Sequence, residues 1–340
     1  MLKEGGNARL IGNEYPGSVF GQIRRTIDLD TCATVSTSTL AYNSAHHASV
    51  WLNGKPVTVG GMVRNSSGAV FSSAWSQYDH NQALGYLYSP GVHDPELVKI
   101  SDTEAIAMGG WEWSTTSAQV WLIDDTLAKA ALPSLNTARS YRTAHHINGK
   151  VYVIGGLFYN GSTLTNLASI EVIDPVAGTT TTASYSLATG RRYHSSVAIG
   201  SKVYVFAGTN IPSLGRGAGL ASIEAIDTVA GTVSSCGALA YPRQHAQTVR
   251  LQRDGKDYVA IFGGEHNGQP VPQAELLDVA TCTTTVLNGV SWGYSDHDRI
   301  HACSGNKVYL VGGENITASP HVGTNKVYTI AFDDDTACVE

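Results

Sequence analysis

Histidine, arginine and tyrosine occur together in short clusters whose chemistry suits acid–base catalysis. Two such clusters are Arg142 with His145 and His146, and Tyr193 with His194. Histidine suits proton transfer because its ordinary pKa lies near neutrality. Arginine can neutralise a carboxylate or a developing enolate. We therefore take these five residues as candidate catalytic groups.

A second set of residues has the types that bind a sugar or a planar organic molecule. Trp111 and Trp113 flank Glu112 directly after a Gly-Gly pair, where an indole can stack on a flat ligand or pack on a neighbouring element. The other candidates for ligand binding are Tyr159, His47, Arg191, His245, Glu265, His297 and Arg299. His297 and Arg299 alternate with His301, but the sequence specifies no further metal-binding partner for them. We predict no metal and no cofactor.

These clusters recur because the chain is built from an internal repeat. Six short apolar runs end in a glycine pair, with Ala207 in place of the first glycine in one of them. The second glycines are Gly61, Gly110, Gly156, Gly208, Gly264 and Gly313. They are 46 to 56 residues apart, which is close to the length of a four-stranded propeller blade.

Each unit contains further apolar runs that predict four strands. In the clearest unit these are strand a at 191–200, strand b at 201–208, strand c at 222–227 and strand d at 231–239. Strand c closes in an acidic residue, as it does in SIEVIDP at 169–175. The glycine pairs are expected to be structural, because the crowded inner strands need dihedrals that a Cβ disfavours.

The units resemble kelch repeats, which read Arg-x-x-His, an apolar run, Asn-Gly-Lys, a second apolar run and Gly-Gly. The best match is LPSLNTARSYRTAHHINGKVYVIGG at 132–156. The resemblance implies an all-β fold, a kelch-type β-propeller with four antiparallel strands per blade, forming a single domain over residues 1–340. Residues 38–340 supply six units.

Residues 1–37 are expected to add a compact or partial seventh blade. RRTIDLDTCATV at 24–35 matches strands c and d, and Gly5-Gly6 precedes it as a glycine pair precedes strand c elsewhere. A six-bladed ring with an N-terminal extension is the alternative. In both arrangements we expect the N- and C-terminal segments to pair, because closure protects the edge strands.

The strand order places the d–a and b–c loops on one face of the ring, so the candidate residues should share one rim. Arg-x-x-His usually ties adjacent blades in this family, which is the structural alternative for His194, His47 and His245. Arg142 stands where the repeat expects histidine, with Arg139 as the repeat's own arginine. His145 and His146 are adjacent in strand a, so they face opposite ways. One of them should face the channel.

Together these features predict a propeller that binds a small organic or carbohydrate ligand in an axial funnel lined by His, Arg, Tyr and Trp. The resemblance implies acid–base chemistry of the lyase, epimerase or isomerase, or cyclase type. A non-enzymatic protein-interaction propeller is the alternative. Tyr193-His194 is similar to a pair in galactose-oxidase-like kelch rings, but no further domain or crosslinking cysteine is evident, so we predict no copper.

Composition limits the partners. The net charge is −6 without a basic block, so a nucleic-acid partner is not expected, and no apolar run is long enough for a membrane span. The five cysteines form no CxxC pair, which leaves room for one or two disulfides. Glycosylation sequons at Asn65, Asn160 and Asn315 favour an extracellular or secretory location.

Overall fold

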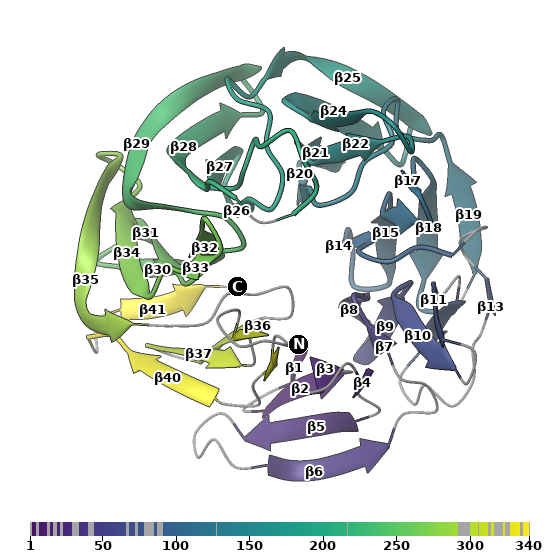
Figure 1. Cartoon of the computed structure of the whole chain (residues 1–340), viewed down its shortest axis with the longest axis horizontal. Helices are drawn as coiled ribbons and strands as arrows, with labels where there is room; N and C mark the ends of the chain where they lie inside the picture. The colour runs from purple at the N-terminus through teal and green to yellow at the C-terminus, as the bar shows by residue number, and fades with distance from the viewer. Residues whose placement is uncertain are drawn as a thin grey trace.

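The computed structural model of the chain is a ring of antiparallel sheets set around a central axis (Figure 1). The structure describes residues 2–4, 7–11, 14–15, 19–20, 23–28, 34–39, 44–65, 68–71, 74–77, 85–86, 91–126, 128–215, 217–291, 300–304, 306–311, 314–315, 322–323, 327–333 and 336–339. Within these residues no helix is long and apolar enough to cross a lipid bilayer.

Most of the radial sheets contain four strands in the order in which they occur along the chain. Their bounds, from the N-terminus, are β1 (Leu2–Glu4), β2 (Asn7–Ile11), β5 (Ile23–Asp28) and β6 (Thr34–Thr39); β8 (Ala48–Leu52), β9 (Lys55–Val59), β12 (Ala74–Gln77) and β13 (Gly85–Tyr86); β14 (Glu96–Lys99), β15 (Glu104–Met108), β18 (Val120–Asp124) and β19 (Lys129–Leu132); β20 (Thr143–Ile147), β21 (Lys150–Ile154), β24 (Ser169–Asp174) and β25 (Thr179–Ser186); and β26 (Ser195–Ile199), β27 (Lys202–Phe206), β28 (Leu220–Asp227) and β29 (Thr232–Arg243).

The two remaining radial sheets share the C-terminal part of the chain. One comprises β30 (Gln247–Arg253), β31 (Lys256–Phe262), β34 (Gln273–Asp278) and β35 (Thr283–Ser291), with β41 (Thr336–Val339) added beside β30; the other comprises β36 (Ile300–Ser304), β37 (Lys307–Val311) and β40 (Val327–Ala331). The last sheet therefore has three strands among the described residues, because β41 joins its neighbour.

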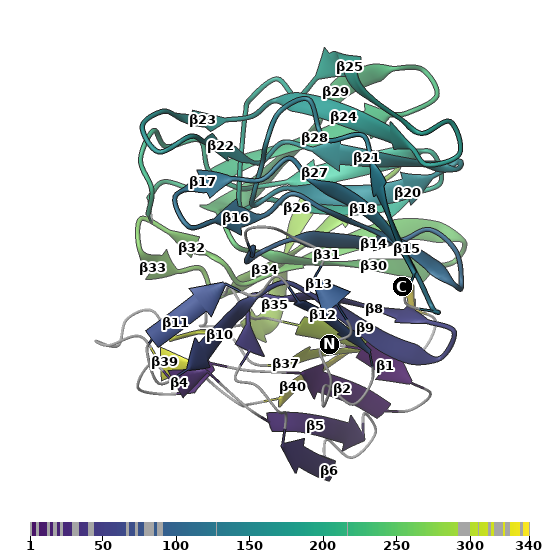
Figure 2. The ribbon, with the colours of Figure 1, turned by 90° about the vertical axis from the view of Figure 1, so that its right-hand side faces the viewer.

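Short hairpins between the second and third strands of the sheets project to one side of the ring (Figure 2). They comprise β3 (Glu14–Tyr15) with β4 (Val19–Phe20); β10 (Met62–Asn65) with β11 (Gly68–Phe71) and β7 (Ser44–Ala45); β16 (Trp111–Glu112) with β17 (Thr115–Thr116); β22 (Leu157–Tyr159) with β23 (Leu164–Asn166); β32 (Glu265–His266) with β33 (Gln269–Pro270); and β38 (Glu314–Asn315) with β39 (Val322–Gly323).

The structure changes two details of the expected strand pattern. Strand a of the unit at 191–239 begins at Ser195 rather than at Arg191, and strand d extends to Arg243. The Gly5-Gly6 pair falls between β1 and β2, which pair as a hairpin, so it is not equivalent to the glycine pairs that follow strand b. β5 and β6 do occupy the places expected for strands c and d.

Ring closure also differs from expectation. β41 pairs with β30, and the N-terminal sheet of β1, β2, β5 and β6 takes no strand from the C-terminal part of the described chain. Instead β3 lies beside β39, so the two ends of the ring meet through their projecting hairpins. Among the described residues, the N-terminal sheet and the sheet of β36, β37 and β40 share no strand, so packing joins the two ends of the ring.

The hydrophobic core lies between neighbouring sheets. Val98 and Ile106 of one sheet pack with Val151 and Val153 of the next in one buried cluster. Ile154 packs with the following sheet in the same way. β-branched residues dominate because both faces of each middle strand are buried against a neighbouring blade. Each sheet therefore depends on the next for its stability.

The turns are set by local residue chemistry. Asn148 and Gly149 connect β20 to β21 with φ angles of 50° and 78°, the left-handed pair of a type I′ hairpin. At the end of strand c, the Asp227 carboxylate accepts the backbone N–H groups of Val229 and Ala230 at 3.0 and 2.9 Å. This explains why strand c closes in an acidic residue.

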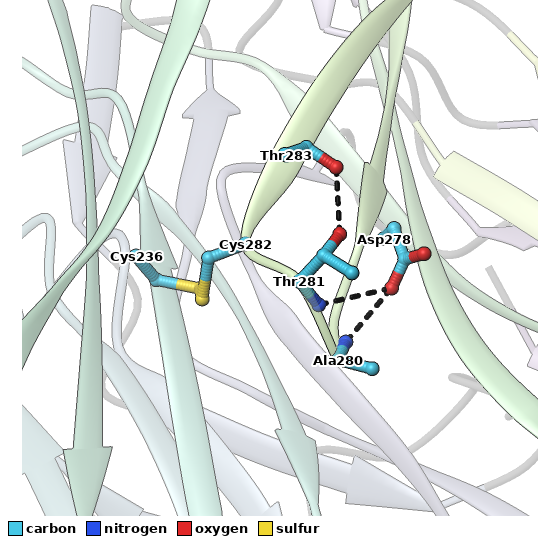
Figure 3. Close-up of a disulfide and its surroundings, with 6 residues drawn as sticks. All are labelled: Cys236, Asp278, Ala280, Thr281, Cys282 and Thr283. Carbon is cyan, nitrogen blue, oxygen red and sulfur yellow. Dashed lines mark hydrogen bonds between the residues drawn. A yellow bond between two sulfur atoms is a disulfide. The ribbon is translucent and has the colours of Figure 1, made fainter.

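A disulfide bond joins two neighbouring sheets. Cys236 of β29 is bonded to Cys282 in the turn between β34 and β35, 46 residues further on (Figure 3). Asp278 holds the same turn through the backbone N–H groups of Ala280 and Thr281. One of the expected bridges is thus present among the described cysteines.

Candidate functional site

The loops that enter strand a meet the loops that leave strand b on one face of the ring. Backbone bridges join these loops in four consecutive units: His93 with Trp111, Ser140 with Leu157, Arg192 with Thr209, and Gln244 with Glu265. The shared rim inferred from the strand order is therefore present. The projecting hairpins of Figure 2 extend this same face.

Five residues at equivalent positions, each two residues before strand a, form the inner edge of this rim. They are His46, Asp94, Tyr141, Tyr193 and His245, and we call them the collar. All five have left-handed φ angles between 49° and 58°, a conformation that is uncommon for residues with a side chain. Strained backbone repeated at one rim is typical of a functional surface.

Hydrogen bonds connect the collar from one blade to the next. The N–H of Asp94 donates to the carbonyl of His46 at 2.9 Å. The N–H of Tyr193 donates to Tyr141 at 3.2 Å, and that of His245 donates to Tyr193 at 2.9 Å. These contacts hold the left-handed residues in a fixed relation around the axis.

The side chains of the rim form a continuous series of ring contacts. The centroid of Tyr193 lies 4.4 Å from Tyr141 and 4.0 Å from His245. Trp111 continues the series, 6.0 Å from Tyr141 and stacked on Tyr159 at 5.4 Å with an interplanar angle of 11°. Tyr159 belongs to the next unit, so Trp111 packs across the blade boundary while it stays half-buried on the rim.

Both collar tyrosines keep their protons at neutral pH. Burial raises the pKa of Tyr141 well above its usual value and raises that of Tyr193 to about 12, although Arg192 opposes the effect at Tyr193. The two tyrosines also share a side-chain hydrogen bond. Their hydroxyl groups are therefore hydrogen-bonding groups rather than bases.

A second group on the rim joins one carboxylate to two imidazoles. Asp94 lies 2.6 Å from Nδ1 of His93 and 3.2 Å from Nδ1 of His46. Burial opposes ionisation of Asp94, but the attraction and hydrogen bonding of His46 and then His93 outweigh it and hold the pKa of Asp94 well below its usual value. His93 lies 6.4 Å from Trp111, so this group adjoins the aromatic series.

Behind the rim, a buried ion pair repeats in three units. Arg191 pairs with Glu224, and its Nη1 donates to the carbonyls of Ala207 at 2.9 Å and Ser222 at 3.2 Å. Arg139 with Glu171 and Arg243 with Glu275 repeat the arrangement. Arg191 has no exposed surface, so it supports the loops and cannot reach a ligand.

Comparison with known protein families identifies a kelch motif in this chain. A family model described as the kelch motif matches residues 138–179, the segment that spans β20 to β24. The chain therefore contains a kelch motif at these residues. The model-matched segment also contains Arg139 and Glu171 of the repeated buried ion pair.

Curated relatives match only part of this chain. A Rho GTPase-activating protein of Dictyostelium discoideum is 38% identical over 73 residues, which are 22% of this chain and 5% of that protein. An F-box/kelch-repeat protein of Arabidopsis thaliana is 36% identical over 89 residues, 26% of this chain and 22% of that protein. The chain therefore spans less than a quarter of the length of each.

Two of the expected catalytic residues form hydrogen bonds to the preceding unit of the ring. Arg142 is buried and donates from Nη1 to the carbonyl of Asp94 at 2.8 Å and from Nη2 to the carbonyl of Met108, both in the preceding unit. His194 is also buried, and its Nε2 lies 3.1 Å from the hydroxyl of Thr143. These contacts favour the role of tying blades together for both residues.

The two adjacent histidines of β20 face neighbouring blades rather than the axis. Nε2 of His145 lies 2.6 Å from Oγ of Ser196 on β26. Alternation along the strand places His146 on the other face, toward β14. Burial lowers the pKa of His145 to about 4, and burial followed by the charge of Arg191 lowers that of His194 to about 3. The imidazoles of His145 and His194 are therefore neutral at neutral pH.

The other candidates are distributed along the rim. Trp113 is 60% exposed in the hairpin between β16 and β17. Glu265 is buried beside His245, with 3.8 Å between Oε1 and Nε2. His47 is half-buried directly after the collar residue His46. His297 and Arg299 lie outside the described residues.

Sequence reasoning missed Asp94 and the shared position of the collar. The signal was present, because the five collar residues are 47 to 52 residues apart, in step with the repeat. The glutamate of each ion pair was also detectable, since it recurs in SIEVID, SIEAID and AELLD.

Proposed function

We propose that this kelch-type propeller binds a small organic or carbohydrate ligand on the aromatic part of the rim. The single observation that carries the proposal is the unbroken series of ring contacts that runs from the half-buried Trp111, Tyr141 and Tyr193 to the buried His245. Aromatic faces of this kind stack on sugar rings and planar molecules. Hydroxyl groups of the two tyrosines add hydrogen bonds that orient the ligand.

The proposal concerns binding rather than turnover. The guanidinium groups of Arg142 and Arg191 hydrogen-bond within the scaffold. The imidazoles of His145 and His194 are neutral and contact neighbouring blades. The lyase, isomerase and cyclase chemistry expected of these residues therefore receives no support from their surroundings.

The experiment measures ligand affinity in collar variants. A panel of mono- and oligosaccharides and aromatic carboxylates is screened by intrinsic fluorescence and followed by calorimetry. Tyr141→Asn and Tyr193→Asn remove the rings and keep a residue that tolerates a left-handed φ. We expect the dissociation constant of a panel member to rise at least tenfold in each variant.

The control is Tyr258→Asn, which removes a tyrosine from β31, at the end of the strand far from the glycine pair. The affinity of Tyr258→Asn for the bound panel member should equal that of the original chain. The proposal would be contradicted if no panel member bound the original chain, or if both collar variants bound the ligand as tightly as the original chain does.

A protein-interaction platform is the second candidate, and the exposed side chain of Trp113 favours it. Tryptophan is enriched among residues that dominate protein interfaces. Trp113→Ala should weaken a protein complex at least tenfold and leave small-ligand affinity unchanged. The reverse pattern would favour the aromatic site alone.

We also propose a seven-bladed ring within a single domain over residues 1–340. Support comes from the N-terminal sheet, which contains β1, β2, β5 and β6 and contributes a complete four-stranded unit. The disulfide and the glycosylation sequons together favour a secretory-pathway location, since disulfides persist in oxidising compartments.

A further inference from the structure

We infer that His46, His93 and Asp94 form a binding site for a divalent transition-metal ion of the zinc type on the rim. One donor atom from each of the three side chains lies within 4.8 Å of the others. The site is distinct from the aromatic series and does not depend on the proposed ligand, although His93 adjoins Trp111.

The donor separations suit a single ion. Two atoms bound to zinc at about 2.0–2.2 Å are about 3.3–3.6 Å apart when the geometry is tetrahedral. The carboxylate oxygens of Asp94 lie 2.6 Å from Nδ1 of His93 and 3.2 Å from Nδ1 of His46. Side-chain rotations that shift the donor atoms by about 1 Å would therefore bring them around one ion.

The chemistry of the donor set also suits zinc. Two imidazoles and one carboxylate are borderline ligands, which fit zinc and its neighbours better than calcium or magnesium. Three protein ligands leave at least one position open for water or for an oxygen of a bound molecule. The side chains are 13–23% exposed, so the open position can be reached from the rim.

The backbone of all three residues is fixed by hydrogen bonds within and between units. Asp94 N–H donates to the carbonyl of His46, and the carbonyl of Asp94 accepts from Arg142 at 2.8 Å. His93 exchanges backbone hydrogen bonds with Trp111 at 3.0 and 2.8 Å. Ligand residues held in place by a second layer of contacts are the usual setting of a metal site.

The test titrates cobalt(II) and then zinc(II) into the untagged full chain after dialysis against a chelator. Cobalt bound to nitrogen and oxygen ligands gives visible absorption bands, and calorimetry gives the stoichiometry with zinc. We expect one ion per chain. Bound zinc should also raise the melting temperature, because an ion that binds only the folded state stabilises it.

Two variants preserve the backbone while removing ligands. Asp94→Asn and His46→Asn place asparagine at left-handed positions that it tolerates, with φ angles of 49° and 58°. Each should lose the cobalt spectrum and weaken zinc binding at least tenfold. His93→Gln, at a position without a left-handed φ, should behave in the same way and covers the case in which one of the first two fails to fold.

The matched control is His245→Asn, which removes an imidazole from the equivalent collar position of another unit with the same φ of 58°. It should bind zinc and cobalt as the original chain does. Absence of a cobalt spectrum in the original chain would overturn the metal site. Equal zinc affinity in Asp94→Asn, His93→Gln and the original chain would overturn it as well.

Discussion

At the residue scale, the same side-chain types have opposite roles according to which way they face. Arg191 and His194 are buried in contacts that join blades, whereas Tyr193, between Arg192 and His194 in the sequence, lies half-buried on the rim. The left-handed φ of 54° at Tyr193 turns the chain at this point. A single backbone conformation thus separates the rim residue Tyr193, which we propose binds ligand, from its buried neighbours.

The buried histidines make stability depend on pH. The pKa of His145 is lowered to about 4 by burial, so the folded state keeps it neutral while the unfolded chain takes up a proton below about pH 6.5. The unfolded state then binds more protons as the pH falls. We expect the free energy of unfolding to decrease from pH 6.5 toward pH 4, by up to about 1.4 kcal/mol per pH unit from this group.

Urea unfolding at several pH values measures this effect. In His145→Asn the free energy of unfolding should fall less steeply with decreasing pH, because unfolding then takes up one proton fewer. Ser196→Ala keeps the imidazole buried and should retain the dependence, because burial is the cause of the shift. An unchanged slope in His145→Asn would contradict the assignment.

The buried ion pair should be costly to break. Arg191→Met leaves the carboxylate of Glu224 in the protein interior without its cation, so we expect a loss of about 3–5 kcal/mol in the free energy of unfolding. Lys202→Met is the control, because Lys202 and Asp227 form an exposed pair at 4.0 Å worth less than about 1 kcal/mol. Equal losses in urea unfolding of the two variants would argue against the scaffold role.

At the element scale, the second glycine of the pair lets the end of strand b pass close to the loop that enters strand a of the same unit. A Cβ on Gly208 would lie 2.7 Å from the carbonyl oxygen of Arg192 and 2.9 Å from Cβ of His194. Ala207 fills the first position of this pair with φ at 62° and a fully buried methyl group. Alanine adopts this left-handed region at a cost of about 1–2 kcal/mol, so the backbone at Ala207 is strained.

Alanine substitutions at two glycines with left-handed φ angles distinguish the cost of backbone strain from the cost of steric crowding. Gly208→Ala combines both, so we expect a loss of about 3 kcal/mol or more. Gly200→Ala, with φ at 59° and nothing within 4 Å of the new Cβ, should lose only about 1 kcal/mol. Thermal unfolding of both variants measures the difference, and equal losses would show that close packing is not what requires Gly208.

At the scale of the whole molecule, neighbouring blades are joined by buried apolar clusters, by arginine contacts and in one place by a covalent bond. Arg142 reaches the carbonyls of the preceding unit, and Cys236 is bonded to the turn of the following sheet. Because the described core clusters each join neighbouring sheets, we expect the ring to unfold as a cooperative unit.

The disulfide should contribute measurably to that cooperativity. It closes a loop of 46 residues, and the chain-entropy model then gives a stabilisation of about 4 kcal/mol. We expect the double variant Cys236→Ala, Cys282→Ala to lose about this amount in denaturant unfolding. Reductant should destabilise the original chain similarly and leave the variant unchanged. A variant as stable as the original would contradict the bond's structural role.

The repeat, the strand order and the shared rim followed from the sequence alone. Local backbone preferences can be recognised from the sequence in the glycine pairs, the Asn-Gly turns and the apolar runs. The alternating direction of consecutive strands then places the loops on one face. Arg139 and Arg191 were likewise recognisable as repeat residues from their spacing.

Only the tertiary structure decided which side chains meet. His46 and Asp94 are 48 residues apart in the sequence and touch because consecutive units stand side by side around the axis. The orientation of His145 was also undetermined by alternation, since both faces of an inner strand turn toward a neighbouring blade and either is buried. Contacts between units depend on the closed ring, and no local pattern specifies them.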